Sequence, residues 1–205
     1  MKIGILGGTF DPVHFGHLRS ALEVKEGLGL AKVLFVPSYM PPHKSGHTLT
    51  PFSLRVELLK IATRGEEAFE LVDIEKDLPT PSYTVNTLAA LRDRYGNAAD
   101  FHFLLGSDAF FDLVTWHDYT RIMEHTKLVV MIRDQNSTDD IVSFSKRHFT
   151  DEFQSNAIIP FEVTNIAISS SRIRAILSQG RSTRYLLPFD CIKFMEEQGL
   201  TYEKH

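Results

Sequence analysis

The sequence is poor in the features that mark secreted, membrane-spanning and nucleic-acid-binding proteins. Cys191 is the only cysteine, so no internal disulfide can form. No apolar run approaches the roughly 20 residues that a membrane-spanning helix requires, and no secretory signal is recognisable. The formal net charge of −4 excludes a surface that attracts nucleic acid or acidic lipid as a whole. We therefore expect a cytoplasmic protein with small-molecule ligands and with neither a nucleic-acid nor a membrane partner.

Internal repeats and low-complexity tracts are also missing, which favours one globular unit. The 205 residues, of which 43% are hydrophobic, suit a single domain over 1–205 with one proper core. Short apolar runs alternate with helical patterns, and this alternation predicts an α/β fold with a doubly wound, mostly parallel sheet. The expected strands are 2–6, 32–36, 69–74, 100–105, 127–132 and 157–163.

Glycine, proline and serine punctuate the expected helices. A first helix, 16–27, ends at Gly27, and a second, 52–64, follows Thr50 as its N-cap and Pro51 in its first turn. Further helices are expected over 84–95 and 137–149, and a small C-terminal helical part over about 169–205. The stretch 37–50 is too rich in proline and glycine for a regular element, so we expect a functional loop.

Four chemically unusual stretches follow predicted strands. They are residues 7–17, 37–47, 106–108 and 168–174. In an open α/β sheet, ligands bind outside the carboxyl ends of the strands. We therefore expect the four stretches to converge on one edge of the sheet.

The first of these stretches, GGTFDPVHFGH, combines a glycine turn with two histidines. Gly7 and Gly8 leave room for a ligand beside the backbone, although the pattern is neither the dinucleotide fingerprint nor a P-loop. His14 and His17 lie three residues apart at a helix start, beside free backbone N–H groups. This arrangement favours a site for the negative charge of phosphate oxygens. The alternatives are a helix cap with an ordinary surface histidine, and a metal pair that lacks a clear third ligand.

The chain resembles the nucleotidyltransferase superfamily in two places: residues 7–17 are similar to its G-x-F-D-P-x-H-x-G-H motif, and ISSSRIR (168–174) to its serine-rich helix start. Within that superfamily, PPHK (41–44), SYTVNTL (82–88), LLGSDAF (104–110) and TWH (115–117) resemble the nicotinate mononucleotide adenylyltransferases. The resemblance runs from residue 3 to about residue 188 and implies a Rossmann-like nucleotidyltransferase fold. It also implies the reaction of ATP with nicotinate mononucleotide to give nicotinate adenine dinucleotide and pyrophosphate in NAD biosynthesis.

The resemblance assigns roles at the triphosphate. His14 and His17 would steady the transition state, while Lys44 and Arg174 would hold the β- and γ-phosphates. Mg²⁺ is implied as a cofactor that the ATP phosphates bind, with no metal site made by the protein alone. The implied ATP-binding residues are Gly7, Gly8, Thr9, Phe10, His17, Gly106, Asp108, Ser169, Ser170, Ser171 and Arg174.

For the mononucleotide, the resemblance implies Thr84, Trp116, His117 and Lys44. Trp116 would stack on the pyridine ring, and main-chain N–H groups near Trp116 and His117 would join Thr84 in receiving the carboxylate. A carboxylate only accepts hydrogen bonds, so a cluster of fixed donors disfavours the amide of nicotinamide. The residues alone leave Trp116 open as a core anchor.

Alternatives remain open at other positions and for the function. Asp108 could bind a ribose hydroxyl, help to hold magnesium, or N-cap the following helix, and the serines at 169–171 could be helix caps. A hydrolytic triad around WHD is disfavoured because no G-x-S-x-G elbow exists. The competing functions are a nicotinamide mononucleotide or phosphopantetheine adenylyltransferase, a cytidylyltransferase, and a non-catalytic nucleotide-binding regulator. Asp134 and Gln135 stand where many family members have proline and glycine, and homo-oligomerisation stays open.

Overall fold

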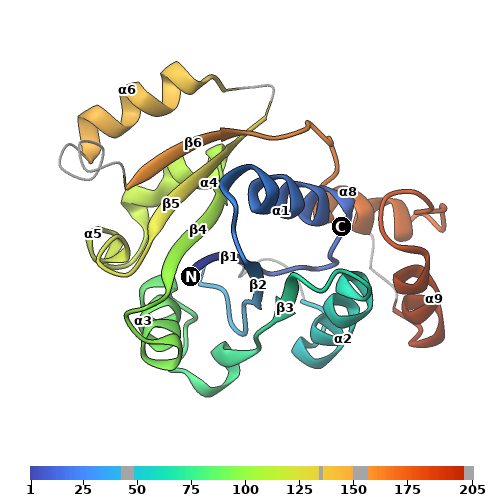
Figure 1. Cartoon of the computed structure of the whole chain (residues 1–205). Helices are drawn as coiled ribbons and strands as arrows, with labels where there is room; N and C mark the ends of the chain where they lie inside the picture. The colour runs from blue at the N-terminus through green and yellow to red at the C-terminus, as the bar shows by residue number, and fades with distance from the viewer. Residues whose placement is uncertain (43–48, 134–135, 150–156, 201–205) are drawn as a thin grey trace.

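A parallel β-sheet forms the centre of the protein (Figure 1). The computed structural model describes residues 1–42, 49–133, 136–149 and 157–200. Within these ranges every neighbouring pair of strands is parallel, and the order is β3-β2-β1-β4-β5-β6. The strands are β1 Lys2–Gly8, β2 Lys32–Pro37, β3 Phe69–Leu71, β4 Asp100–Gly106, β5 Lys127–Ile132 and β6 Ile158–Glu162. The expected α/β fold with a doubly wound sheet is confirmed.

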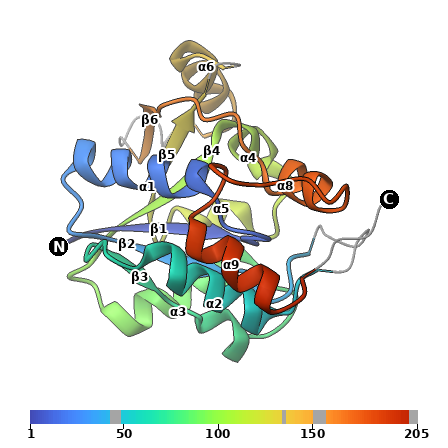
Figure 2. The same cartoon turned by 90° about the vertical axis from the view of Figure 1, so that its right-hand side faces the viewer.

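Helices cover both faces of this sheet. One face carries α3 Thr84–Tyr95, α4 Ser107–Asp112, α5 Tyr119–Ile122 and α6 Thr138–His148, together with the short 3₁₀ turns η1 Ile74–Asp77 and η2 Leu113–Thr115. The other face carries α1 Phe15–Leu28, α2 Phe52–Thr63, α8 Ser170–Leu177 and α9 Phe189–Glu197. Figure 2 shows α9 lying against α2. Helices therefore bury both surfaces of the strands.

Successive side chains of one strand enter two different hydrophobic cores. In β2, Leu34 and Val36 join the core under α3, whereas Val33 and Phe35 join the core under α1 and α2. All four are at most 1% exposed. Burial on both faces explains why the strand sequences are apolar at consecutive positions rather than at alternate ones.

The strand order reverses between β1 and β4, which lie side by side at the centre. The chain winds outward from β1 through β2 to β3, then returns to β4 and winds outward the other way. Leu6 is in register with Leu104, so Gly8 and Gly106 end their strands at the same edge. A reversal of this kind opens a crevice at the carboxyl ends of the strands.

Three local expectations are wrong in detail. Thr50 does not cap α2: Pro51 is the N-cap residue, and the backbone of Thr50 instead bonds to Asp11 and Arg55. The strand expected over 69–74 ends at Leu71, after which the chain turns into η1. The first helix continues through Gly27 to Leu28 and stops at the left-handed Gly29, because Gly27 is a packing position rather than a helix end.

Cys191 lies in the core between α9 and α2. Its thiol is fully buried and its sulfur lies 3.5 Å from the Leu58 carbonyl oxygen. Burial, with a smaller contribution from Asp190, raises the pKa of this thiol to about 12. Such a thiol is not a nucleophile at neutral pH. None of the helices in the described ranges has the length and apolar character needed to cross a bilayer.

We predict that Gly27→Ala destabilises the protein although alanine is the better helix former. A Cβ at this position would meet the Phe161 ring of β6, which packs directly on the helix backbone. The propensity gain is about 1 kcal/mol, and overpacking costs typically about 1–3 kcal/mol. Urea unfolding should therefore show a lower free energy of unfolding for the variant.

Phe161→Leu provides the control for this prediction. In that background the shorter side chain leaves space beside Gly27, so the same glycine-to-alanine change should cost less or become stabilising. A Gly27→Ala protein at least as stable as the parent would show that α1 and β6 are not held at the distance that the structure gives.

Candidate active site

The site is built where loops leave the carboxyl edge of the sheet. The loop 9–14 follows β1 and leads into α1, residues 38–42 follow β2, and residues 107–118 follow β4. The segment after β6 leads to α8, whose Ser170 hydroxyl donates to the Pro12 carbonyl at 2.9 Å. The structure thus brings three of the four expected stretches together. Of the fourth, 37–47, only residues 37–42 are described, and the predicted site residue Lys44 lies outside the described residues.

The glycine turn folds over the ring of Phe10. A Cβ on Gly8 would lie 3.2 Å from that ring, so a larger residue would fit there only if the ring shifted by a few tenths of an ångström. Phe10 itself has a left-handed backbone with φ of 48° and is 2% exposed. Its ring lies edge-on to His17, with the centroids 5.1 Å apart. The Phe10 ring therefore packs against His17. Because the ring is buried, a nucleotide contact from Phe10 would use its backbone.

His14 and His17 form a stacked pair at the start of α1. Their ring centroids are 3.7 Å apart and the planes differ by 26°. The His14 backbone N–H donates to Nδ1 of His17 at 3.3 Å. Because Nδ1 of His17 accepts this bond, the proton of the neutral ring is on Nε2, which can donate to a ligand.

Burial makes His14 a neutral hydrogen-bonding group. The residue is 3% exposed, and its Nδ1 has no hydrogen-bond partner among the described residues. Desolvation, followed by the nearby positive charge of Arg133, lowers the pKa of His14 to about 4. At neutral pH the ring therefore contributes a hydrogen bond rather than a positive charge.

The serines and Arg174 hold the loop 9–14 against α8. Arg174 donates from Nη1 to the Asp11 carbonyl at 2.7 Å and from Nη2 to the Ser171 hydroxyl at 3.3 Å. Ser169 caps α8 by accepting from the N–H of Arg172 at 3.2 Å, so the capping alternative holds for this serine. Arg172 is exposed, whereas Arg174 is half-buried against the loop that it holds.

On the other side of the crevice, an aromatic pair joins α3 to the loop after η2. The rings of Tyr83 and His117 stack with centroids 4.1 Å apart. Thr84 is the first residue of α3, which has no side-chain cap, so its N–H lies at an unsatisfied helix start. The His117 N–H has no partner in the described part of the chain. Two of the three described residues expected at the mononucleotide are therefore linked through Tyr83.

Trp116 is half-buried and belongs partly to the core. Its ring lies edge-on to Phe103, with the centroids 6.5 Å apart. Its backbone N–H donates to the Leu113 carbonyl at 2.9 Å, so this N–H is already in use. Any carboxylate contact in this loop falls to the neighbouring His117 N–H, while the ring keeps one accessible part.

Gly106 and Asp108 lie where β4 passes into α4. Gly106 is the N-cap residue, and Asp108 lies in the first turn with no capping bond, so the capping alternative for Asp108 is wrong. A Cβ on Gly106 would collide with the Asp108 carboxylate, which folds back over the strand end. The described residues contain no group of three His, Cys, Asp or Glu side chains that could hold a metal ion.

Sequence reasoning missed four charged residues around the site. Arg133 follows β5 near His14, and Arg55 of α2 lies beneath the loops with Asp11 and Glu75. Arg55 is 1% exposed, Asp11 is 1% exposed and Glu75 is 6% exposed. The signal was present for Arg55, because it interrupts the apolar pattern of the helix 52–64. An arginine at such a position needs buried acceptors.

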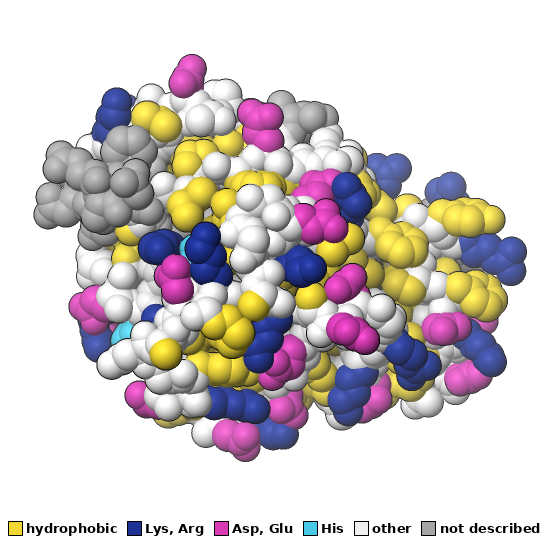
Figure 3. Space-filling model, viewed as in Figure 1, with side chains coloured by type: hydrophobic (Ala, Val, Ile, Leu, Met, Phe, Trp, Pro, Cys, Tyr) yellow, Lys and Arg dark blue, Asp and Glu magenta, His cyan; other side chains and the backbone are white. Residues whose placement is uncertain are grey.

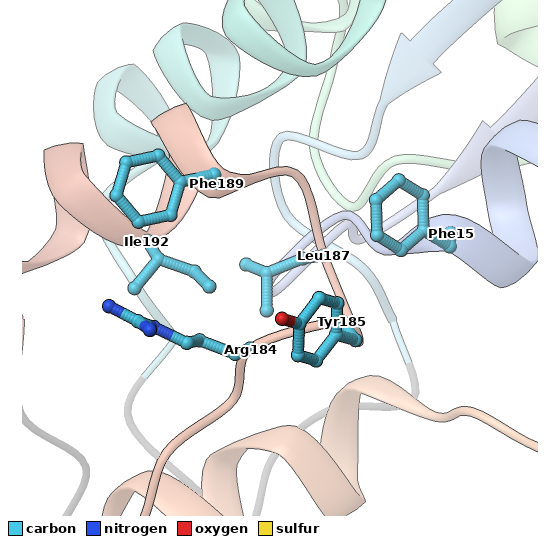
Figure 4. A pocket seen from close by; sticks show the side chains of 6 residues that line it. All are labelled: Phe15, Arg184, Tyr185, Leu187, Phe189 and Ile192. Carbon is cyan, nitrogen blue, oxygen red and sulfur yellow. The ribbon is translucent and has the colours of Figure 1, made fainter.

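A separate apolar pocket lies between the start of α1 and α9. It has a volume of about 270 Å³ and is lined by Phe15, Arg184, Tyr185, Leu187, Phe189 and Ile192, as Figure 4 shows. Tyr185 and Phe189 are 89% and 61% exposed. Figure 3 shows hydrophobic side chains gathered at the corresponding right-hand end of the molecule. No sequence motif pointed to this pocket.

A family model and curated relatives match most of the chain. Residues 5–176 match the family model described as cytidylyltransferase-like. Two relatives named "probable nicotinate-nucleotide adenylyltransferase" are 36% identical over 212 residues, in Geobacter sulfurreducens, and 38% over 208 residues, in Shewanella sediminis. Each alignment covers 98% of this chain and 98% of the relative.

A solved structure with the same fold is the Plasmodium falciparum nicotinic acid mononucleotide adenylyltransferase, described in complexes with APC and with NaAD. The TM-score to each is 0.75, over 97% of this chain and 96% of the other. The sequence identities are 19% and 18%, so this likeness bears on the fold alone.

The buried neutral His14 predicts a specific loss of stability in acid. Its pKa is about 4 in the folded chain against 6.5 as a free side chain, so only the unfolded state takes up a proton between these values. The free energy of unfolding should fall as pH decreases from 6.5 to 4, by at most about 3 kcal/mol from this group.

Urea unfolding of wild type and His14→Asn at several pH values between 7 and 4.5 measures this contribution. The stability difference between the two proteins should shrink as pH falls. His117→Asn, which removes an exposed histidine, is the matched control. The difference in free energy of unfolding between this variant and wild type should stay constant over the same pH range. A constant difference between wild type and His14→Asn would contradict the neutral, buried state of His14.

Proposed function

The chain belongs to the cytidylyltransferase-like family and, within it, to the nicotinate-nucleotide adenylyltransferases, and from this premise we propose that it joins the AMP part of ATP to nicotinate mononucleotide. The products are nicotinate adenine dinucleotide and pyrophosphate, in the biosynthesis of NAD. The observation that carries the proposal is the stacked His14–His17 pair, which begins α1 beside the loop that Arg174 holds. We place the enzyme in the cytoplasm.

In the proposed reaction, a phosphate oxygen of the mononucleotide attacks the α-phosphorus of ATP in line with the departing pyrophosphate. The attacking oxygen is already an anion, so no general base has to create the nucleophile. Catalysis then consists mainly of positioning and of charge stabilisation at the phosphate oxygens. The residues around the crevice match this demand, because they offer hydrogen-bond donors and positive charge.

His14 and His17 contribute differently from a cationic pair. His14 is neutral at pH 7, and His17 presents an Nε2–H because its Nδ1 already accepts a bond. Each ring can donate one hydrogen bond to a phosphate oxygen whose charge grows in the transition state. The positive charge comes from Arg174 and Arg133, and from Lys44 as the sequence motif implies.

Magnesium fits this site as an ion that the substrate brings. Mg²⁺ is commonly held by substrate phosphates with one or two carboxylates and several waters. Asp108 is the exposed carboxylate at the end of β4 that would complete such a set. Bound there, the ion neutralises negative charge on the phosphates of ATP. The other proposed ATP contacts are Gly7, Gly8, Thr9, Gly106, Ser169, Ser170 and Ser171.

At the mononucleotide, the acid is preferred over the amide because the nearby backbone offers donors. The N–H groups of His117 and of Thr84 can both donate to a carboxylate. The NH₂ of a nicotinamide would face these donors without an acceptor, which costs about 1–3 kcal/mol for an unmade hydrogen bond. Trp116 offers the remaining surface for the pyridine ring.

Pyrophosphate release from magnesium-ATP tests the proposed function directly. Nicotinate mononucleotide, nicotinamide mononucleotide and phosphopantetheine are compared as acceptors, with CTP replacing ATP in a parallel series. We expect release with ATP and nicotinate mononucleotide, at a kcat/KM at least about tenfold above that with the amide, as expected from about 1.4 kcal/mol of discrimination. Release only with phosphopantetheine or with CTP would assign a different transferase, and no release would favour a nucleotide-binding regulator.

His17→Ala should lower kcat about 10²–10³-fold, which is the effect of removing one donor to a charged transition state. The KM for ATP should change little, because the bond strengthens mainly when charge develops. Steady-state kinetics with both substrates measure the two effects. Lys193→Ala, on the exposed face of α9, is the control, and a His17→Ala enzyme with near-normal turnover would remove His17 from the mechanism.

A further inference from the structure

One buried guanidinium connects the backbones of three segments. Arg55 donates from Nη1 to the carbonyls of Thr9 and Ser38, at 2.7 and 2.8 Å. Its Nη2 donates to the carbonyl of Tyr39 at 3.4 Å, and its Nε to that of Thr50 at 2.9 Å. The side chain is 1% exposed. The planar fork of arginine can reach several acceptors in fixed directions, which a lysine ammonium cannot do.

The three segments belong to the walls of the crevice. Thr9 begins the loop that leads from β1 to His14, Ser38 and Tyr39 follow the end of β2, and Thr50 precedes α2. Arg55 therefore sets the distance between the backbone after β1 and the backbone after β2. Through these two bonds a single side chain joins the backbone after β1 to the backbone after β2.

Two buried carboxylates balance the charge of Arg55. An Asp11 oxygen accepts from the Thr50 N–H at 3.5 Å. Glu75 accepts from the Tyr39 N–H at 3.0 Å and from the Thr87 hydroxyl at 2.8 Å. Both negative charges favour the charged form of Arg55, against the burial that lowers its pKa. The arginine and its two partners form one buried polar network.

This network reaches both substrate regions. At one end, the Asp11 carbonyl accepts from Arg174, the proposed triphosphate contact. At the other end, Thr87 lies one turn into α3, the helix that begins at Thr84. A change in the position of Arg55 would shift the loop before His14 relative to the start of α3.

We propose that Arg55, balanced by Asp11 and Glu75, is a positioning residue for adenylyl transfer, which sets the spacing between the ATP half and the mononucleotide half of the crevice. The inference rests on the proposed function. In-line transfer requires reacting atoms about 3–3.5 Å apart, and a misplacement of about 1 Å can cost about 10²-fold in rate. Arg55 acts through the backbone that it holds rather than by touching a substrate.

Arg55→Lys tests the proposal, and Arg92→Lys is the matched control. Arg92 also donates to three backbone carbonyls, those of Gly96, Ala99 and His125, but it does so at the opposite edge of the sheet, near the start of β4. Both changes keep the charge and remove the fork. A merely structural role predicts that the two variants lose thermal stability and active fraction in the same way.

For Arg55→Lys we expect kcat about 10²-fold lower, with each KM changed less than about threefold, because each substrate still binds its own half. For Arg92→Lys we expect kcat within about threefold of wild type. Its Tm should fall about as much as that of Arg55→Lys. Added guanidinium ion should restore at least part of the turnover that Arg55→Ala loses. The same addition should leave the turnover of Arg92→Ala unchanged. Equal kcat values for Arg55→Lys and Arg92→Lys would overturn the proposal.

Two further measurements keep the test independent of folding and of the reaction. Glu75→Gln leaves Arg55 in place and removes one balancing charge, so it should lower kcat with little change in either KM; unchanged kcat would count against the network. Hydrogen exchange of the amides in 9–13 and 38–40 should accelerate in Arg55→Lys and stay unchanged in Arg92→Lys. This readout needs no substrate, so it separates failure of the positioning role from failure of the proposed function.

Discussion

The architecture of the site depends on the hydrogen bonding of backbone carbonyls in the loop after β1. Thr9, Asp11 and Pro12 have carbonyls that accept from Arg55, Arg174 and Ser170, which come from two distant helices. A buried carbonyl without a partner costs about 1–3 kcal/mol. The helices α2 and α8 are therefore tied to the loop by a requirement of the backbone itself. Because the same loop leads directly into His14, the need to satisfy its carbonyls also fixes where α1 begins.

The electrostatics of the site separate hydrogen bonding from charge. His14 and His17 stack closely, and two imidazolium ions at 3.7 Å would repel each other in a desolvated place. The low pKa of His14 avoids this repulsion. Positive charge is instead carried by arginines, which stay protonated even when buried. A phosphate-transferring site benefits from this division, because neutral donors respond to developing charge without holding the ground-state anion too tightly.

The sequence predicted those parts of the fold that periodicity and local capping control. Consecutive apolar residues in 32–36 and 127–132 indicated strands buried on both faces, and the serine at 169 indicated a helix cap. The expectations failed where a contact distant in sequence decides the local structure. Gly27 looked like a helix end and is a contact with Phe161, and Thr50 looked like a cap and is a partner of Asp11 and Arg55. No local pattern contains such information, because the partner lies on another element.

For the candidate site, the residue types and their order came from the sequence, and their physical state came from the fold. The spacing of His14 and His17 by itself determined that two rings would lie on one side of a helix start. Only the tertiary structure decided that one ring is buried and neutral, since desolvation depends on what packs around it. The Tyr83–His117 stack and the Arg55 network likewise join segments 34 and 46 residues apart in the chain. Such groups meet only because a parallel sheet brings the ends of all its strands to one edge.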